Sequence, residues 1–152
     1  MIVVDACVAI KWFLPEDGSA QALDLFRNSE ALIAPDSIRS EVAGAVTKRV
    51  RRGELTDAEA RQILAMWLDA LKEGVLQTVA ALEDLREAGN LSLQLQHGLA
   101  DCLYIALARR TGARLVTADE RMVNKTSQVY AKVALLHRLP NVTEHTEAAA
   151  RS

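Results

Sequence analysis

The 152-residue chain has few residues that could crosslink it, with only two cysteines, and few aromatic residues, at 4%. Cys7 and Cys102 form no CxxC pair, which argues against a disulfide framework and a structural zinc site. No apolar run is long enough to span a membrane, and no basic segment precedes an apolar core at the N-terminus. We therefore expect a cytoplasmic protein without a signal peptide, with reduced and mostly buried thiols.

Several common catalytic motifs are also missing. The sequence contains no GxSxG, GxxxxGKS/T or GxGxxG motif, which disfavours α/β-hydrolases, P-loop enzymes and dinucleotide-binding proteins. The histidines His97, His137 and His145 are scattered, with no HExxH motif. Because the formal net charge is -2, a nucleic-acid site has to be a local basic patch.

What the chain does have is the composition of a globular domain. Half of the residues are hydrophobic and a quarter are charged, which disfavours a disordered chain. At this length we expect one domain with one core over residues 1–143. The polar, alanine-rich segment 144–152 is expected to be a frayed tail.

Short apolar segments alternate with amphipathic ones along the chain. The expected strands cover residues 2–4, 31–34, 75–79, 115–117 and 132–136. Residues 115–117 are apolar without alternation, which is typical of a strand buried on both faces. The order predicts an α/β fold with a parallel sheet flanked by helices on both faces.

Two consecutive helices are expected to form a protruding helical hairpin. The first starts near Ser37, carries an apolar stripe spaced by four residues and ends in a basic run before Gly53. The second starts at the capping box formed by Thr56 and Glu59. Further on, helical segments over residues 82–95 are expected to be interrupted near Gly89 and Asn90. The helix that follows is expected to end at Gly112.

Four acidic residues stand near the ends of the expected elements. Asp5 directly follows the first strand, and Asp119 lies two residues after the strand at 115–117. Asp101 lies at the front of a helix, and Glu41 edges the apolar stripe one turn into another. Ligands of open α/β sheets bind at the carboxyl ends of the strands, where these side chains can meet. Each has an ordinary explanation too, because aspartates cap helices and Glu41 can be a solvated flank residue.

A cluster of carboxylates has a clear chemical meaning. Two such charges about 4 Å apart repel by roughly 4 kcal/mol at an effective dielectric of 20, so three or four need cations beside them. Hard oxygen ligands suit Mg²⁺ or Mn²⁺, and such an ion bridges phosphate oxygens and activates water. The pattern therefore predicts metal-assisted chemistry on phosphates.

The chain resembles the PIN-domain ribonucleases, and within them the VapC-type toxins of bacterial and archaeal toxin–antitoxin pairs. The ordered segments that carry the resemblance are IVVDACVAIKWFLPE, APDSIRSEVAGAV and LADCLYIALARRTGARLVTADERM, followed by the closing strand. The resemblance implies a metal-dependent endoribonuclease that is inhibited by a small antitoxin and is usually dimeric. The acidic tetrad of the family falls on Asp5, Glu41, Asp101 and Asp119, as catalytic residues and ligands of Mg²⁺ or Mn²⁺.

Two residues depart from the family pattern. Cys7 stands where the family often has Ser or Thr, and Gly44 stands where it often has Asn, so a hydroxyl and an amide beside the acids are missing. Thr117 matches a frequent family hydroxyl near the last acid, although a β-branched strand residue is equally explained by packing. The resemblance also favours a homodimer through the helix at 56–71, whose Trp67 can instead belong to the core.

Two alternatives and the RNA-binding surface remain open. An aspartate phosphate-transfer domain, either a haloacid-dehalogenase-like phosphatase or a receiver domain, could use Asp5 as nucleophile, but it lacks a second acid at position 7. A non-catalytic PIN-like binding module is the other alternative. Basic residues that could contact an RNA backbone are each better explained, taken singly, as solvated charges: Lys48, Arg49, Arg51, Arg52, Arg109, Arg110, Arg114, Arg121 and Lys125.

Overall fold

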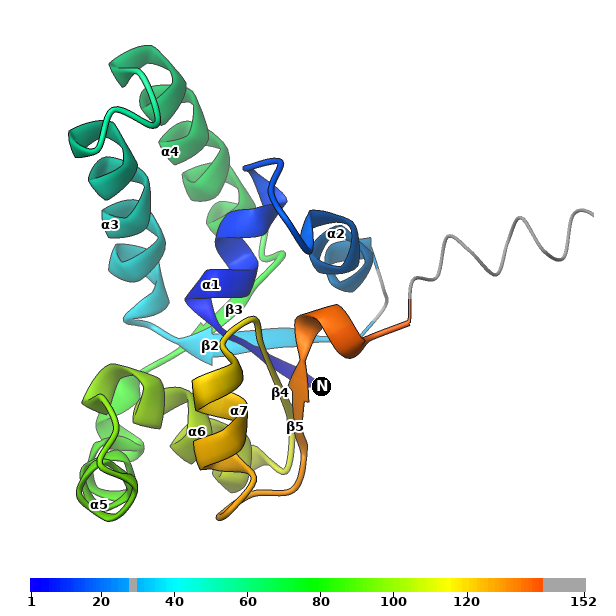
Figure 1. The fold of residues 1–152 in the computed structure, drawn as a ribbon, viewed down its shortest axis with the longest axis vertical. Helices are drawn as coiled ribbons and strands as arrows, with labels where there is room; N and C mark the ends of the chain where they lie inside the picture. The colour runs from blue at the N-terminus through cyan, green and yellow to red at the C-terminus, as the bar shows by residue number, and fades with distance from the viewer. Residues whose placement is uncertain (28–29, 141–152) are drawn as a thin grey trace, which may run out of the picture.

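A computed structural model describes residues 1–27 and 30–140. Five parallel strands form one sheet in the order β3-β2-β1-β4-β5 (Figure 1). They are β1 (Ile2–Val4), β2 (Leu32–Pro35), β3 (Gln77–Val79), β4 (Arg114–Thr117) and β5 (Val133–Leu135). The five predicted strands are confirmed, with ends that differ by one or two residues. The predicted tail at 144–152 lies outside the described residues, so the domain boundary at residue 143 stays a prediction.

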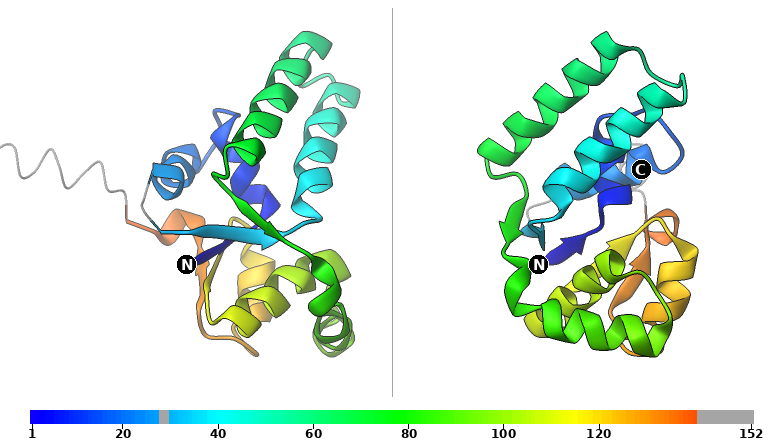
Figure 2. Two further views of the ribbon diagram at one scale, coloured as in Figure 1. Left: turned by 180° about the vertical axis from the view of Figure 1, so that it is seen from behind. Right: turned by 90° about the vertical axis from the view of Figure 1, so that its left-hand side faces the viewer.

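Helices cover both faces of this sheet, which confirms the predicted α/β architecture. The α-helices of the described residues are α1 (Ala6–Ala9), α2 (Ser19–Arg27), α3 (Ile38–Arg51), α4 (Asp57–Lys72), α5 (Leu85–Leu95), α6 (Leu99–Thr111) and α7 (Glu120–Thr126). Short 3₁₀ turns are η1 (Ile10–Trp12), η2 (Ala81–Glu83) and η3 (Leu136–Arg138). Helices α1 to α4 lie on one face, and α5 to α7 lie on the other (Figures 1 and 2).

The chain reverses its direction across the sheet between β3 and β4. It first lays down β1, β2 and β3 side by side, then crosses back and adds β4 and β5 on the other side of β1. Val4 of β1 pairs with Val116 of β4, so the carboxyl ends of these two strands are neighbours. In open α/β sheets this switch point is where ligands bind.

The predicted helical hairpin is formed by α3 and α4, which extend together away from the sheet (Figure 1). The capping box is present, since the Thr56 hydroxyl accepts from the Glu59 amide and the Glu59 carboxylate accepts from the Thr56 amide. Trp67 is only 1% exposed and donates its indole N–H to the Arg39 carbonyl at 3.1 Å. Trp67 is therefore part of the core, whereas Met66 and Leu68 of the same helix are exposed.

The predicted interruption near Gly89 and Asn90 is wrong. Helix α5 runs through both residues without a break. A glycine inside a helix costs about 1 kcal/mol relative to alanine. Ala88, Leu91 and Leu95 are buried on the side of α5 that packs along α6, and this burial offsets the local cost.

The composition led to expectations about the two thiols and about membrane-spanning segments. Both cysteines are free, with Cys102 buried and Cys7 half-buried. Over residues 1–27 and 30–140, no helix combines the length and the apolar character that crossing a membrane requires.

Candidate active site

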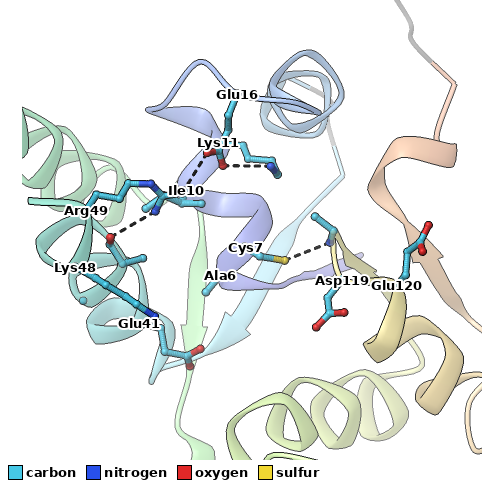
Figure 3. Close-up of a pocket in the computed structure, with 13 residues that line it drawn as sticks. Ala6, Cys7, Ile10, Lys11, Glu16, Glu41, Lys48, Arg49, Asp119 and Glu120 are labelled. Carbon is cyan, nitrogen blue, oxygen red and sulfur yellow. Dashed lines mark hydrogen bonds and ion pairs between the residues drawn. The ribbon is translucent and has the colours of Figure 1, made fainter. Parts of the chain in front are cut away.

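The four predicted acids come to one edge of the sheet. Asp5 is the first residue after β1, and Asp119 follows β4 with one residue between. Helices α3 and α6 both start at this edge, which places Glu41 and Asp101 in the first turns of these two helices. Figure 3 shows Glu41 and Asp119 on two sides of the same space. Burial raises the pKa of both Glu41 and Asp101, and the charge of Asp5 raises both further, so the acids influence one another.

Asp5 is fixed by side chains rather than by a helix end. It occupies the N-cap position of α1, but its carboxylate makes no capping hydrogen bond. Instead its Oδ2 atom accepts a hydrogen bond from the Thr117 hydroxyl at 2.6 Å and one from the Cys7 thiol at 2.9 Å. Asp5 is 6% exposed, so these donors replace much of the water that a buried carboxylate loses.

Thr117 connects two of the acids. Its fully buried hydroxyl donates to Asp5 and accepts from the backbone amide of Asp119 at 3.1 Å. The explanation of Thr117 as a packing residue alone is therefore insufficient. Bonds on both sides hold the two carboxyl-bearing residues in a fixed relation across β1 and β4.

Cys7 connects Asp5 to the segment that follows β4. The thiol donates to Asp5 and accepts from the Ala118 amide at 3.2 Å. Burial, followed by the negative charge of Asp5, raises the pKa of Cys7 far above the ordinary thiol value. The residue is therefore a neutral thiol that donates as a hydroxyl would.

Asp119 and Asp101 differ in how they relate to their helices. Asp119 does cap α7, since its Oδ1 atom accepts from the amides of Arg121 at 2.8 Å and Met122 at 3.4 Å. Asp101 does not cap α6, because the N-cap residue of that helix is Gly98. The capping explanation therefore holds for Asp119 alone among the four acids.

A histidine stands beside Asp101. His97 Nε2 lies 2.9 Å from Asp101 Oδ2, with the ring N–H poorly aligned to the oxygen. Burial raises the pKa of Asp101, the charges of Asp5 and Asp119 raise it further, and His97 opposes them. A spacing of four positions is a weak sign of this contact in the sequence, because residues four apart lie on the same face of a helix.

Glu41 is held by two hydroxyl groups. Its Oε1 atom accepts from Ser37 at 2.8 Å and from the buried phenol of Tyr104 at 3.2 Å. Burial raises the pKa of Glu41, and these two bonds act against the rise. Sequence reasoning did not identify Ser37, Tyr104 or His97. Ser37 could have been found from its spacing, since it precedes Glu41 by one helical turn.

The donor set suits a hard, hydrated cation. In the described part of the chain, no three histidine, cysteine or acidic side chains are close enough together to hold an ion by themselves. Mg²⁺ usually keeps several waters and binds through only one or two carboxylates, so it fits such an open set of oxygens. The raised pKa values of Glu41 and Asp101 indicate that added positive charge would be favourable here.

A groove of about 720 Å³ opens at this edge. Cys7, Glu41 and Asp119 line one part of it, and Lys11, Lys48 and Arg49 line another (Figure 3). Of the basic residues predicted to contact RNA, Lys48 and Arg49 are those that line this groove. The site thus combines a cluster of carboxylates with an adjoining basic wall.

The PIN domain family model matches residues 2–127 of the chain. Ribonuclease VapC3 of Pyrobaculum aerophilum is 32% identical over 126 residues, covering 82% of this chain and 93% of the relative. The crystal structure of VapC20 of Mycobacterium tuberculosis, described as a Sarcin-Ricin loop cleaving toxin, matches with a TM-score of 0.62 and 14% identity. That match covers 82% of this chain and 94% of VapC20. A toxin–antitoxin complex from Klebsiella pneumoniae matches with a TM-score of 0.57 and 15% identity, over 91% of this chain and 100% of that one. The chain therefore belongs to the PIN-domain family, among relatives that are VapC ribonucleases.

Proposed function

We propose that the protein is a metal-dependent endoribonuclease that hydrolyses phosphodiester bonds in RNA. The observation that carries this proposal is the placement of four carboxylates at one edge of the sheet, beside a groove with a basic wall. Carboxylates alone repel phosphate, whereas carboxylates that hold a divalent cation attract it. Relatives named VapC ribonucleases support RNA as the substrate.

In this proposal Asp5, Asp101 and Asp119 hold Mg²⁺ or Mn²⁺, directly or through water. When bound, the ion lowers the pKa of an attacking water and stabilises charge on the phosphate. Glu41 completes the set or orients that water, and Ser37 and Tyr104 fix its carboxylate.

We further propose that the protein is the toxin of a type II toxin–antitoxin system, inhibited by a small cognate antitoxin. Two observations support this: the relatives are VapC proteins, and a structural neighbour is a toxin–antitoxin complex. Unpaired or loop RNA is the favoured substrate, because unstacked bases can enter a shallow groove. The structural neighbour VapC20, a toxin that cleaves the Sarcin-Ricin loop, agrees with this choice.

The test is RNA cleavage by the purified chain with Mg²⁺ or Mn²⁺, with and without a chelator. We expect cleavage of single-stranded RNA that stops when the metal is removed. Asp101→Asn is the decisive variant, because it keeps the side-chain volume and removes no helix cap. The rate should fall on the order of 100-fold or more, which corresponds to about 2.7 kcal/mol of transition-state stabilisation.

Each alternative gives a different result in the same experiment. If Asp101→Asn cleaves as fast as the parent, the activity comes from elsewhere and the nuclease proposal fails. Stabilisation by Mg²⁺ without any cleavage would identify a non-catalytic PIN-like module. A trapped acyl-phosphate on Asp5 would support aspartate phosphate transfer instead.

A further inference from the structure

We infer that Lys48 forms a phosphate subsite in the groove, which binds an RNA backbone phosphate beside the four carboxylates. The inference rests on the proposed function and specifies which cation holds the strand. It uses the basic wall of the groove, which adjoins Glu41 and Asp119.

Helix α3 connects the two parts of the groove. Glu41, Ala45 and Lys48 follow one another at spacings of four and three residues, so they share one face of the helix. Seven residues separate Glu41 from Lys48, which at 1.5 Å per residue is about 10 Å along the helix. This rise separates the two backbone positions, and the long Lys48 side chain spans much of it, so its ammonium group can reach a phosphate beside the carboxylates.

Small residues keep the path between these two points open. Gly44 and Ala45 line the groove between Glu41 and Lys48. A Cβ atom built on Gly44 would meet nothing within 4 Å, so the space above it is free. Gly44 thus leaves room for the strand.

The three cations of the basic wall are not equivalent. Glu16 pairs with both Lys11 and Arg49, at 3.1 Å in each case, and Lys11 also donates to the Asp17 carbonyl at 2.7 Å. Glu16 therefore offsets part of their charge and holds both side chains in place (Figure 3). Lys48 is exposed and forms no ion pair among the residues that the structure describes, so its charge is available to a phosphate.

Three other arginines predicted to contact RNA form ion pairs within the chain. Arg110 forms a two-pronged pair with buried Asp84, at 2.7 and 3.0 Å. Arg109 lies 2.7 Å from Glu87, and Arg114 lies 3.6 Å from Glu30 at the opposite end of the sheet. These pairs reduce the positive charge available elsewhere and leave Lys48 as the groove cation best able to bind RNA.

The experiment measures binding of a short fluorescent single-stranded RNA to the full chain carrying Asp101→Asn, so that no cleavage occurs. Affinity is followed across a salt titration at fixed Mg²⁺. Adding Lys48→Gln should weaken binding several-fold at low salt. It should also make the slope of log affinity against log salt shallower by about 0.7, the value for one lost contact to single-stranded nucleic acid.

Two further variants make the result specific. Lys72→Gln removes the same charge from an exposed position on α4 that does not line the groove, and it should leave the slope unchanged. Glu16→Gln removes a negative charge from the basic wall, so it should strengthen binding and steepen the slope. Melting temperatures of all variants confirm that each one is folded.

The outcomes separate this inference from the proposed function. If the parent cleaves RNA but Lys48→Gln behaves like Lys72→Gln, the Lys48 subsite is wrong and the nuclease stands. Equal losses for both lysine variants would indicate general electrostatic attraction and would also overturn the subsite. If the parent chain neither binds nor cleaves RNA, both proposals fall.

Discussion

Two buried threonines differ in what their hydroxyl groups do. Thr117 donates to Asp5 and accepts from Asp119, whereas the hydroxyl of Thr126 has no hydrogen-bond partner among the described residues. Thr117→Val should therefore lower the free energy of unfolding by about 1–3 kcal/mol. Each kcal/mol lowers the melting temperature by roughly 2–4 °C. Thr126→Val should be neutral or stabilising. Thermal unfolding without added metal compares the two, and equal losses would show that the Thr117 bonds contribute nothing.

The raised pKa of Asp101 predicts a pH dependence of stability. A carboxyl group whose pKa is raised on folding stabilises the protein at low pH, and this contribution is lost as the pH rises through the raised pKa. Without metal, Asp101→Asn should therefore gain stability relative to the parent from about pH 4 upward. Melting curves at pH values across the acidic and neutral range measure this difference, which Mg²⁺ should reverse at neutral pH by stabilising only the parent. A difference that does not change with pH would contradict the prediction.

At the scale of elements, two adjacent arginines at the end of α6 have different roles. Arg110 reaches back to buried Asp84 at the start of α5, whereas Arg109 pairs with exposed Glu87. Arg110→Met leaves the Asp84 carboxylate buried without its partner, which should cost about 1–3 kcal/mol, because Arg110 itself is 39% exposed. Arg109→Met loses a surface pair worth about 0–1 kcal/mol. Denaturant unfolding measures both, and similar costs would show that the Asp84 pair does not join α5 to α6.

At the scale of the whole molecule, exposed apolar side chains bear on the proposed homodimer. Leu68 of α4 is 54% exposed, while Leu82 beside α5 and Leu93 within it are 82% and 75% exposed. Exposed apolar side chains mark a protein interface where they form a contiguous patch. We expect a sedimentation mass of two chains at micromolar concentration, and a mass of one chain would contradict the homodimer. Leu68→Glu and Leu93→Glu locate the interface, since the variant that halves the mass lies within it.

The sequence by itself determined features that depend on neighbours within a few residues. Uninterrupted apolar segments located β1, β2 and β4, because a parallel strand in the middle of a sheet is buried on both faces. The capping box at Thr56 and the left-handed cap at Gly112, with φ of 68°, follow from local backbone hydrogen bonding. The four acids could be located because a fold with alternating strands and helices brings the carboxyl ends of its parallel strands to one edge.

Only the tertiary structure decided what each side chain contacts across the fold. Thr117 reaches Asp5 over 112 positions, and Tyr104 reaches Glu41 over 63, so no local pattern reveals either bond. Burial against α6 kept α5 continuous through Gly89, although local propensity favours a break there. The same packing decided which cations are consumed by internal pairs and which, like Lys48, remain available. These outcomes depend on distances between elements, which packing of the whole core sets and local sequence does not.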